Sequence, residues 1–445
     1  MSVSHDFSTV RLEDTLDAIS RHVLLDGFEM VLDLRASHGS YMHDALTGRD
    51  YLDFYAFFAS MPLTFNHPRL REPDFQAELL AVAGAKVANA DIYTHPYAKF
   101  VQAFADVAQL PGMDRFFFID SGALAVENAM KAAFDWKVRK NLAAGRGEIG
   151  GKIMHFRQAF HGRTGYTMSV TNTDPTKVKY FPKFDWPRID NPKLDFTLDE
   201  SERTRDVIAR EEQAIQQIHA AIAQHGHDIA GLLIEPIQCE GGDNHFRAEF
   251  LRALRDICDQ HEMLLLFDEV QTGVGATGKM WCCEHFDVTP DVIAFGKKMQ
   301  TCGIMAGPRL NEVDSVFKVS SRINSTWGGN LVDMVRATRI LRIIEEENLI
   351  EHAATQGEYL LDGLHRLADK HPSVTNVRGR GLLCAVDVPN AAMRDAIRDA
   401  AYDRQMMILT CGERSLRFRP VLDVSTEDLS RGLEILDDAI GAVSE

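Results

Sequence analysis

Two short apolar runs, each ending at a charged residue, constrain the fold more than any other feature of the sequence. The run Met263 to Phe267 has the length of a strand and leads into Asp268. A second run, Asp291 to Phe295, leads into Lys297. The acid and the lysine are about thirty residues apart, which fits one strand–helix–strand step of a parallel sheet. Because functional groups in open α/β sheets gather where the strands end, we expect both side chains at one sheet edge.

An acid and a lysine at one sheet edge have a particular chemical use. A lysine amine can form a Schiff base with an aldehyde cofactor, and a buried carboxylate can keep a pyridine nitrogen protonated. Pyridoxal phosphate requires both groups, because its protonated ring accepts the electrons of the reaction. An ordinary ion pair would give the same sequence pattern, so the two residues alone do not decide between these interpretations.

A third predicted strand leads into a turn of small residues. The run Arg115 to Ile119 is followed by Ser-Gly-Ala and an Ala-rich helix. The N–H groups of Gly122 and Ala123 at the start of that helix would suit a phosphate, because the helix dipole is positive there. A Ser-Gly pair before a helix is also an ordinary helix cap, so this feature too has two interpretations.

Two later strands are followed by loops with aromatic and charged residues. The predicted strand Lys152 to Phe156 leads to Phe160 and Arg163, and the predicted strand Gly231 to Ile237 leads to Glu240. Taken alone, the aromatic side chain indicates loop packing, and the two charges indicate solvated side chains.

The composition indicates a globular protein with small-molecule partners. With 445 residues and 45% apolar content, the chain can bury one large domain and one smaller domain. The net charge of −17 argues against nucleic-acid binding. The seven cysteines have no metal-ligand spacing, so we expect no metal site and reduced thiols in a cytoplasmic protein. No stretch has the pattern of a signal peptide or the length of a membrane span, so we expect no membrane partner.

The residues around the lysine resemble a family signature. FDEVQTG, PDVIAFGK and the small residues that follow them resemble the signature of the class III (omega) aminotransferases, which are pyridoxal phosphate enzymes of fold type I. The reactive lysine of that signature follows a small residue, so Gly296 favours Lys297 over Lys298. The chain departs from the common form at Val274 and Ala276, where Phe and Arg are frequent. It also lacks the glycines that usually follow the lysine. These departures indicate a subfamily with the same chemistry.

The resemblance implies an α/β fold with two domains. The large cofactor-binding domain would span residues 65–330 and contain a mostly parallel seven-stranded sheet. A smaller α+β domain would be made from both chain ends, residues 1–64 and 331–445. We find no internal repeat and no long linker between the domains.

The resemblance also implies the residues that hold pyridoxal 5'-phosphate. Lys297 and Asp268 would be catalytic, and Phe160 would stack on the pyridine ring. The family usually has a hydroxyl residue where this chain has Ala123, so the phosphate would lose one side-chain donor. Thr326 would reach the phosphate of the partner subunit in a homodimer with shared active sites, although Asn-Ser-Thr before a helix is also explained by capping. The implied cofactor-binding residues are Gly122, Ala123, Phe160, Asp268, Gln271, Lys297 and Thr326.

The implied substrate residues fit a substrate with a terminal amine. Arg163 would hold a carboxylate with a bidentate fork, and Glu240 would pair with Arg417 or turn away and free it. The implied substrate-binding residues are Arg163, Glu240, Gln271, Asn324 and Arg417.

The likeness is greatest to members that act on the ε-amine of lysine, and it runs through FHGRTGYTMSVTN, FPKFDWPRIDNPK, FGKKMQTCGIMAG and NSTWGGN. The implied ping-pong reaction moves the 6-amino group of L-lysine to 2-oxoglutarate and yields 2-aminoadipate 6-semialdehyde and L-glutamate. Another omega-aminotransferase, with an ornithine, 4-aminobutyrate or diamine donor, would share the catalytic residues. A relative that racemises or decarboxylates would use the same lysine without a keto acid. A pyridoxal-phosphate-binding regulator without turnover is the non-enzyme alternative.

Overall fold

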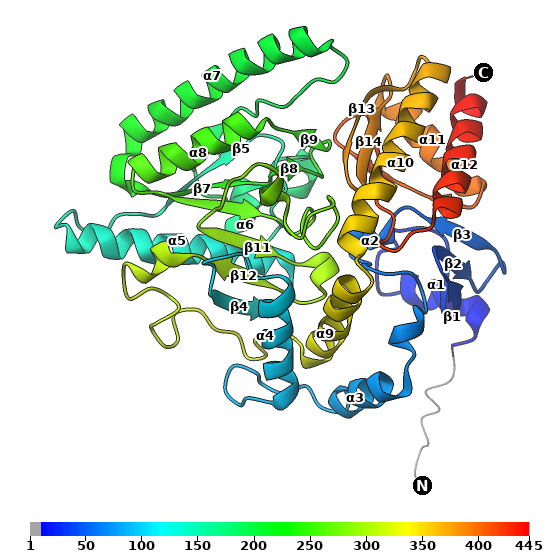
Figure 1. Cartoon of the computed structure of the whole chain (residues 1–445), viewed down its shortest axis with the longest axis horizontal. Helices are drawn as coiled ribbons and strands as arrows, with labels where there is room; N and C mark the ends of the chain where they lie inside the picture. The colour runs from blue at the N-terminus through cyan, green and yellow to red at the C-terminus, as the bar shows by residue number, and fades with distance from the viewer. Residues whose placement is uncertain (1–9, 445) are drawn as a thin grey trace.

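A seven-stranded sheet occupies the centre of the larger part of the molecule, as the computed structural model of residues 10–444 shows (Figure 1). Each neighbouring pair of strands is parallel except the two pairs that include β12, which runs against its neighbours. The predicted mostly parallel seven-stranded sheet is therefore confirmed. The strands, in spatial order, are β4 (Arg115–Ile119), β12 (Cys302–Ala306), β11 (Val292–Phe295), β10 (Leu264–Asp268), β7 (Ile229–Ile234), β5 (Lys152–Phe156) and β6 (Arg188–Ile189).

The central strands are apolar along their whole length because both faces of the sheet are covered. In β10, Leu264 and Leu266 belong to a core that includes helix α5 (Gly122–Ala143). The alternate residues Leu265 and Phe267 belong to a second core that includes helix α8 (Ala248–Gln260). All four side chains are fully buried, and each such burial contributes roughly 1.5–3 kcal/mol.

The sequence-based strand bounds are confirmed for β4 and β5, but β7 ends earlier than expected. Pro236, which cannot donate a ladder hydrogen bond, interrupts the run predicted to reach Ile237. The expected helix between β10 and β11 is also absent from the described residues, although the two strands are parallel neighbours. Turns and a short 3-10 helix make the connection instead. One turn passes so close to the buried Trp281 that a Cβ at Gly273 would lie 2.6 Å from its ring.

Two four-stranded sheets lie beside the large one; the first combines strands from both chain ends, and the second contains C-terminal strands alone (Figure 1). β3 pairs in parallel with β15, so that Leu52 lies opposite Met406. Residues 1–9 and 445 lie outside the described part, and the domain limits 1–64, 65–330 and 331–445 stay a prediction. One sheet contains β1 (Leu32–His38), β2 (Tyr41–Asp44), β3 (Asp50–Asp53) and β15 (Met406–Met407), and the other contains β13 (Thr375–Arg380), β14 (Leu383–Asp387), β17 (Ser415–Phe418) and β16 (Leu409–Cys411).

The remaining elements connect and cover these sheets. The N-terminal helical turns begin at Leu12 and end at Ser20. The other helices are α1 (Thr15–Ser20), α2 (Ala56–Ala59), α3 (Pro73–Ala83), α4 (His95–Val107), α6 (Gly165–Val170), α7 (Glu200–His225), α9 (Leu331–Glu346), α10 (Leu349–Lys370), α11 (Ala391–Asp403) and α12 (Thr426–Ser444). The short pieces are η1 (Leu12–Asp14), η2 (Pro68–Leu70), η3 (Pro175–Lys177), η4 (Gly226–Asp228), η5 (Cys282–His285), η6 (Lys297–Met299), η7 (Pro308–Asn311), β8 (Ile237–Gln238) and β9 (Asn244–His245).

The described residues show three further features that bear on function. All seven cysteines are free thiols, as the sequence predicts, while the cytoplasmic location stays a prediction. Among residues 10–444, no helix has the length and apolar character needed to cross a membrane. The same residues contain no group of His, Cys, Asp and Glu side chains placed to hold a metal ion.

Candidate active site

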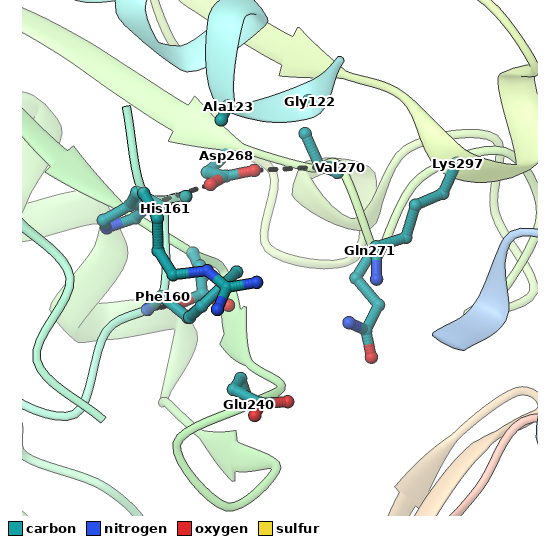
Figure 2. Close-up of a pocket in the computed structure, with 12 residues that line it drawn as sticks. Gly122, Ala123, Phe160, His161, Glu240, Asp268, Val270, Gln271 and Lys297 are labelled. Carbon is teal, nitrogen blue, oxygen red and sulfur yellow. Dashed lines mark hydrogen bonds and ion pairs between the residues drawn. The ribbon is translucent and has the colours of Figure 1, made fainter. Parts of the chain in front are cut away.

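A cavity of about 280 Å³ lies where the strands of the large sheet end (Figure 2). Its walls come from the segments after β4, β5, β7, β10 and β11, which is where open α/β sheets collect functional groups. The structure therefore brings together residues that are far apart in the sequence. The sequence-predicted residues that line the cavity are Gly122, Ala123, Phe160, Arg163, Glu240, Asp268, Gln271 and Lys297.

Lys297 follows β11 and extends into this cavity. Its Nζ donates to the backbone oxygen of Phe58 at 2.7 Å. Burial, together with the nearby Arg417, lowers its pKa to about 8. The neighbouring Lys298 is buried outside the cavity, where its Nζ donates to the oxygen of Ala59 at 2.9 Å. Only the first of the two adjacent lysines can meet a ligand in the cavity.

The segment that receives both lysines has an unusual backbone. All four residues of α2 have positive φ angles between 43° and 66°, which non-glycine residues seldom adopt. The turn is held from two sides. Asp53 accepts hydrogen bonds from the N–H groups of Tyr55 and Ala56, and Gln300 donates to the oxygen of Ser60. The left-handed turn therefore presents its carbonyl oxygens to the end of β11.

Asp268, the last residue of β10, is buried at the cavity wall and is fixed by two hydrogen bonds. Its Oδ2 lies 2.8 Å from Nδ1 of His161, and its Oδ1 accepts from the N–H of Val270 at 3.0 Å (Figure 2). The sequence by itself indicated no role for His161. The residue lies within the Phe-His-Gly-Arg segment, but only the fold shows that its ring orients the carboxylate.

Phe160 and Glu235 form the wall that follows β5 and β7. The N–H of Phe160 donates to Glu235 at 2.9 Å, which fixes the backbone beside the aromatic ring. Burial and the nearby Asp268 raise the pKa of Glu235 well above its ordinary value. The ring of Phe160 is therefore placed by a carboxyl group that favours its protonated form.

Gly122 and Ala123 begin helix α5 at the opposite wall, next to Gly162. The first N–H groups of a helix have no partners within it, and they are suited to a phosphate. Gly162 has a φ of 116°, and a Cβ there would lie 2.4 Å from the Cβ of Ala123. There is therefore no room for a side chain at Gly162 beside the helix start. A buried acid, an aromatic ring, an amine and a helix start around one cavity together fit pyridoxal phosphate.

Glu240 and Arg417 form an ion pair at the cavity, which is the pairing that the family resemblance implied. Oε2 of Glu240 lies 2.6 Å from Nη2 of Arg417, which is almost completely buried. Nη1 of Arg417 donates to Gln271, at 3.4 Å. Burial acts to raise the pKa of Glu240, but Arg417 and Lys177 lower it below the ordinary value. Arg417 thus contacts Glu240 and Gln271, which both line the cavity.

Three other sequence-predicted residues differ in their surroundings. Arg163 lines the cavity and is exposed, and within residues 10–444 it has no ion-pair partner. Asn324 and Thr326 are exposed on the segment between η7 and α9 and do not line the cavity of their own chain. A role for these two in a partner's site stays a prediction.

Comparisons with known proteins show which family this chain resembles. The family profile described as Aminotransferase class-III matches residues 26–440. An L-lysine-epsilon aminotransferase from Amycolatopsis lactamdurans is 51% identical over 95% of this chain and 94% of its own length. A structure of lysine aminotransferase from M. tuberculosis has a TM-score of 0.95 and 49% identity, covering 97% of this chain and 99% of that chain. A mitochondrial 4-aminobutyrate aminotransferase from Sus scrofa is 31% identical over 91% of this chain and 83% of its own length.

The fold and the cavity are those of a pyridoxal-phosphate-dependent transferase of fold type I. Within that class, the chain belongs to the class III aminotransferases, as the resemblance in the sequence predicted.

Proposed function

We propose that this enzyme transfers the ε-amino group of L-lysine to 2-oxoglutarate, giving 2-aminoadipate 6-semialdehyde and L-glutamate. The observation that carries the proposal is the Glu240–Arg417 ion pair, 2.6 Å long, at the cavity that holds Lys297. Such a pair lets one cavity accept both L-lysine, whose aliphatic chain is uncharged, and the dicarboxylate 2-oxoglutarate. The relatives named as L-lysine-epsilon aminotransferases, with about half of their residues identical, support the same donor.

Residues that line the cavity would hold the cofactor. Gly122 and Ala123 would bind the phosphate, Phe160 would lie on the ring, and Asp268 would hold a proton on the ring nitrogen. Gln271 would hydrogen-bond the phenolic oxygen of the ring. When bound, pyridoxal phosphate supplies an aldehyde for the amine and a ring that accepts electrons.

Lys297 would act as both general base and general acid. Its Nζ lies in the cavity, and a pKa of about 8 lets it be neutral or protonated near neutral pH. Nζ would take a proton from the carbon that carries the substrate amine and return it to the cofactor. Asp268, held in place by His161, would keep its charge directed at the ring throughout this transfer.

Arg163 would set the orientation of both substrates. An exposed guanidinium in the cavity wall would bind the α-carboxylate of L-lysine in a bidentate fork, so that the distal ε-amine faces Lys297. The distal carboxylate of 2-oxoglutarate would take the same place in the second half-reaction. Asn324 would contact the substrate from the partner subunit.

The Glu240–Arg417 pair would distinguish the two half-reactions. With the pair closed, the two charges cancel and the aliphatic chain of L-lysine can lie beside them. With Glu240 turned away, Arg417 would bind the α-carboxylate of 2-oxoglutarate.

We further propose that the working form is a homodimer with shared active sites. Thr326 is exposed in its own chain and carries a hydroxyl that would reach the phosphate in the partner subunit's cavity.

The proposal is tested with purified enzyme loaded with pyridoxal phosphate. Adding L-lysine should shift the cofactor absorbance, adding 2-oxoglutarate should restore it, and the products should be the semialdehyde and L-glutamate. Ornithine, 4-aminobutyrate and a diamine are tried as donors in parallel. A faster reaction with one of these would replace L-lysine as the donor, and a protein that reacts with no amine would support the regulator alternative.

A further inference from the structure

Glu240 contacts two cations rather than one. Its Oε2 is paired with Arg417, and its Oε1 lies 2.5 Å from Nζ of Lys177. No motif in the sequence indicates a role for Lys177. The two cations differ in their surroundings, because Arg417 is 1% exposed whereas the side chain of Lys177 is 24% exposed. Each oxygen of the carboxylate therefore has its own positively charged partner.

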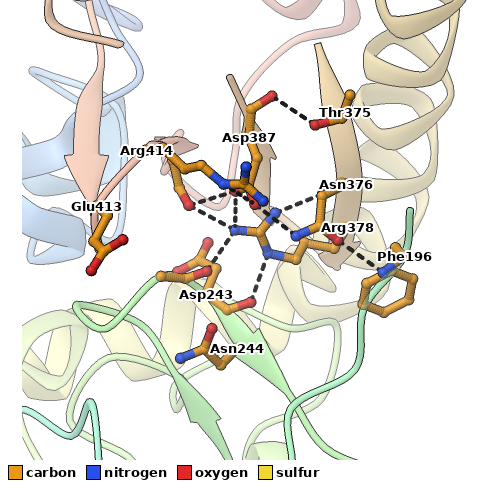
Figure 3. Close-up of polar contacts among 12 residues, drawn as sticks. Phe196, Asp243, Asn244, Thr375, Asn376, Arg378, Asp387, Glu413 and Arg414 are labelled. Atoms are coloured by element: carbon orange, nitrogen blue, oxygen red, sulfur yellow. Dashed lines mark hydrogen bonds and ion pairs between the residues drawn. The ribbon is translucent and has the colours of Figure 1, made fainter. Parts of the chain in front are cut away.

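The loop that follows Glu240 is closely packed, and Figure 3 shows Arg378 beside Asp243 of this loop. A Cβ at Gly241 would lie 1.9 Å from a neighbouring backbone oxygen, which shows how closely the loop is packed there. Arg378 donates to the carbonyl oxygens of Gly242 at 2.6 Å and of Asp243 at 3.0 Å. We therefore expect Glu240 to change its partner by rotation of its side chain rather than by movement of the loop.

Lys177 is held in position by its own short turn. It ends the 3-10 helix η3, where the side chain of Asp174 accepts a hydrogen bond from the N–H of Thr176 at 2.8 Å. Its Nζ also lies 5.3 Å from the centre of the Phe160 ring, which lines the cavity. The ammonium group is thus placed between the acid and the aromatic wall of the cavity.

A charged partner matters because a largely buried carboxylate is costly to leave unpaired. If Glu240 left Arg417 with no other partner, both charges would have to be compensated by the incoming substrate alone. Lys177 already contacts the second oxygen, so Glu240 can rotate and still keep one charge-assisted hydrogen bond.

We propose that Lys177 is a specificity-determining residue, which retains Glu240 when that acid releases Arg417 to a substrate α-carboxylate. The inference rests on the proposed function and extends it to the choice between a keto dicarboxylate and an amine donor. Lys177 therefore favours the open arrangement, which the acceptor requires and the amine donor does not.

The test compares the two half-reactions in four holoenzymes, the wild type and three variants. Lys177→Met removes the charge, Lys177→Arg keeps it, and Lys179→Met is the matched control on the same loop. Lys179 is exposed and contacts the ring of Tyr180, and within the described residues it has no carboxylate partner. The readout is the apparent KM for 2-oxoglutarate divided by the apparent KM for L-lysine.

We expect Lys177→Met to raise this ratio at least tenfold, which corresponds to about 1.4 kcal/mol. Lys177→Arg should stay within about threefold of the wild type and Lys179→Met within about twofold, because only Lys177→Met removes the charged contact with Glu240. Proportional changes of both KM values would show a merely structural role and overturn the proposal. Equal effects of the Met and Arg variants, or of the Lys177 and Lys179 variants, would also overturn it.

A wrong amine donor would not obscure this result. If L-lysine fails to react with the wild type, the proposed function fails, and the donor that does react takes its place in the ratio. The dependence of the 2-oxoglutarate KM on Lys177 is then measured in the same way.

Discussion

Lys297 and Lys298 are adjacent in the sequence, yet the structure gives them separate surroundings. The Nζ of Lys297 lies in the cavity, and that of Lys298 is buried against the left-handed turn at Ala59. The sequence could indicate the first lysine only through the small residue before it. The surroundings of the two amines give a physical reason for the same choice.

Replacing the two lysines in turn tests this assignment. Lys297→Ala should abolish the visible absorbance of the bound cofactor and the transfer of amine, because no other amine lines the described cavity. Lys298→Ala should keep the absorbance, although it should lower stability because the oxygen of Ala59 loses its donor. Absorbance spectra of both variants after loading with pyridoxal phosphate decide the matter. The reverse pattern would contradict the assignment.

The lowered pKa of Lys297 predicts how cofactor loading depends on pH. Burial disfavours the charged amine and brings its pKa to about 8, and only the neutral amine attacks an aldehyde. The rate at which the apoprotein combines with pyridoxal phosphate should therefore rise as pH increases through about 8 and then level off. Stopped-flow absorbance from pH 6 to 10 measures it. A rate that keeps rising towards the ordinary lysine pKa of about 10.4 would contradict the prediction.

At the scale of elements, the buried strands were predictable to within a few residues, and the connections were not. Continuous apolar runs identified β4, β5, β10 and β11, because a strand covered on both faces has no polar alternation. The connection from β10 to β11 has no such periodic signal. Gly273 in this connection packs against Trp281, and that packing depends on the whole fold.

Close packing at the element scale also predicts one costly substitution. Gly357 lies in α10, and a Cβ there would lie 2.2 Å from the backbone of Gly381. Gly357→Ala should therefore destabilise the protein by about 1–3 kcal/mol, although alanine favours a helix. Thermal and denaturant unfolding of the variant measures the effect.

Gly84→Ala is the control for this substitution. The added Cβ would meet nothing within 4 Å and the φ of Gly84 is −71°, so we expect a change within about 0.5 kcal/mol. Equal stabilities of the two variants would show that the contact between α10 and Gly381 is not restrictive.

At the scale of the whole molecule, the site depends on residues that only the fold brings together. Strand-end patterns indicated the lysine and the acid, and the family resemblance implied the roles of the aromatic ring and of the Glu240–Arg417 pair. It could not indicate the contacts of His161 or Lys177, because each depends on the approach of a distant loop. If the exposed Thr326 reaches the partner subunit's cavity, as proposed, the site also depends on the assembly of two chains.

A shared active site predicts complementation between two inactive chains. Lys297→Ala removes the amine of a chain's own site, and Thr326→Glu places a carboxylate near the phosphate of the partner's site. Refolding the two variants together should yield a dimer of twice the 49.9 kDa chain mass. About a quarter of the wild-type activity should return, because half of the dimers are mixed and each has one intact site. If Thr326 served its own chain, no activity would return.

The central claim is that Lys297 handles the terminal amine of L-lysine and passes that nitrogen to 2-oxoglutarate. It is tested most directly by following ¹⁵N from L-lysine labelled at either the ε or the α position into glutamate by mass spectrometry. The account predicts that glutamate carries the ε label and none of the α label. Transfer of the α label, or unlabelled glutamate in both experiments, would contradict it.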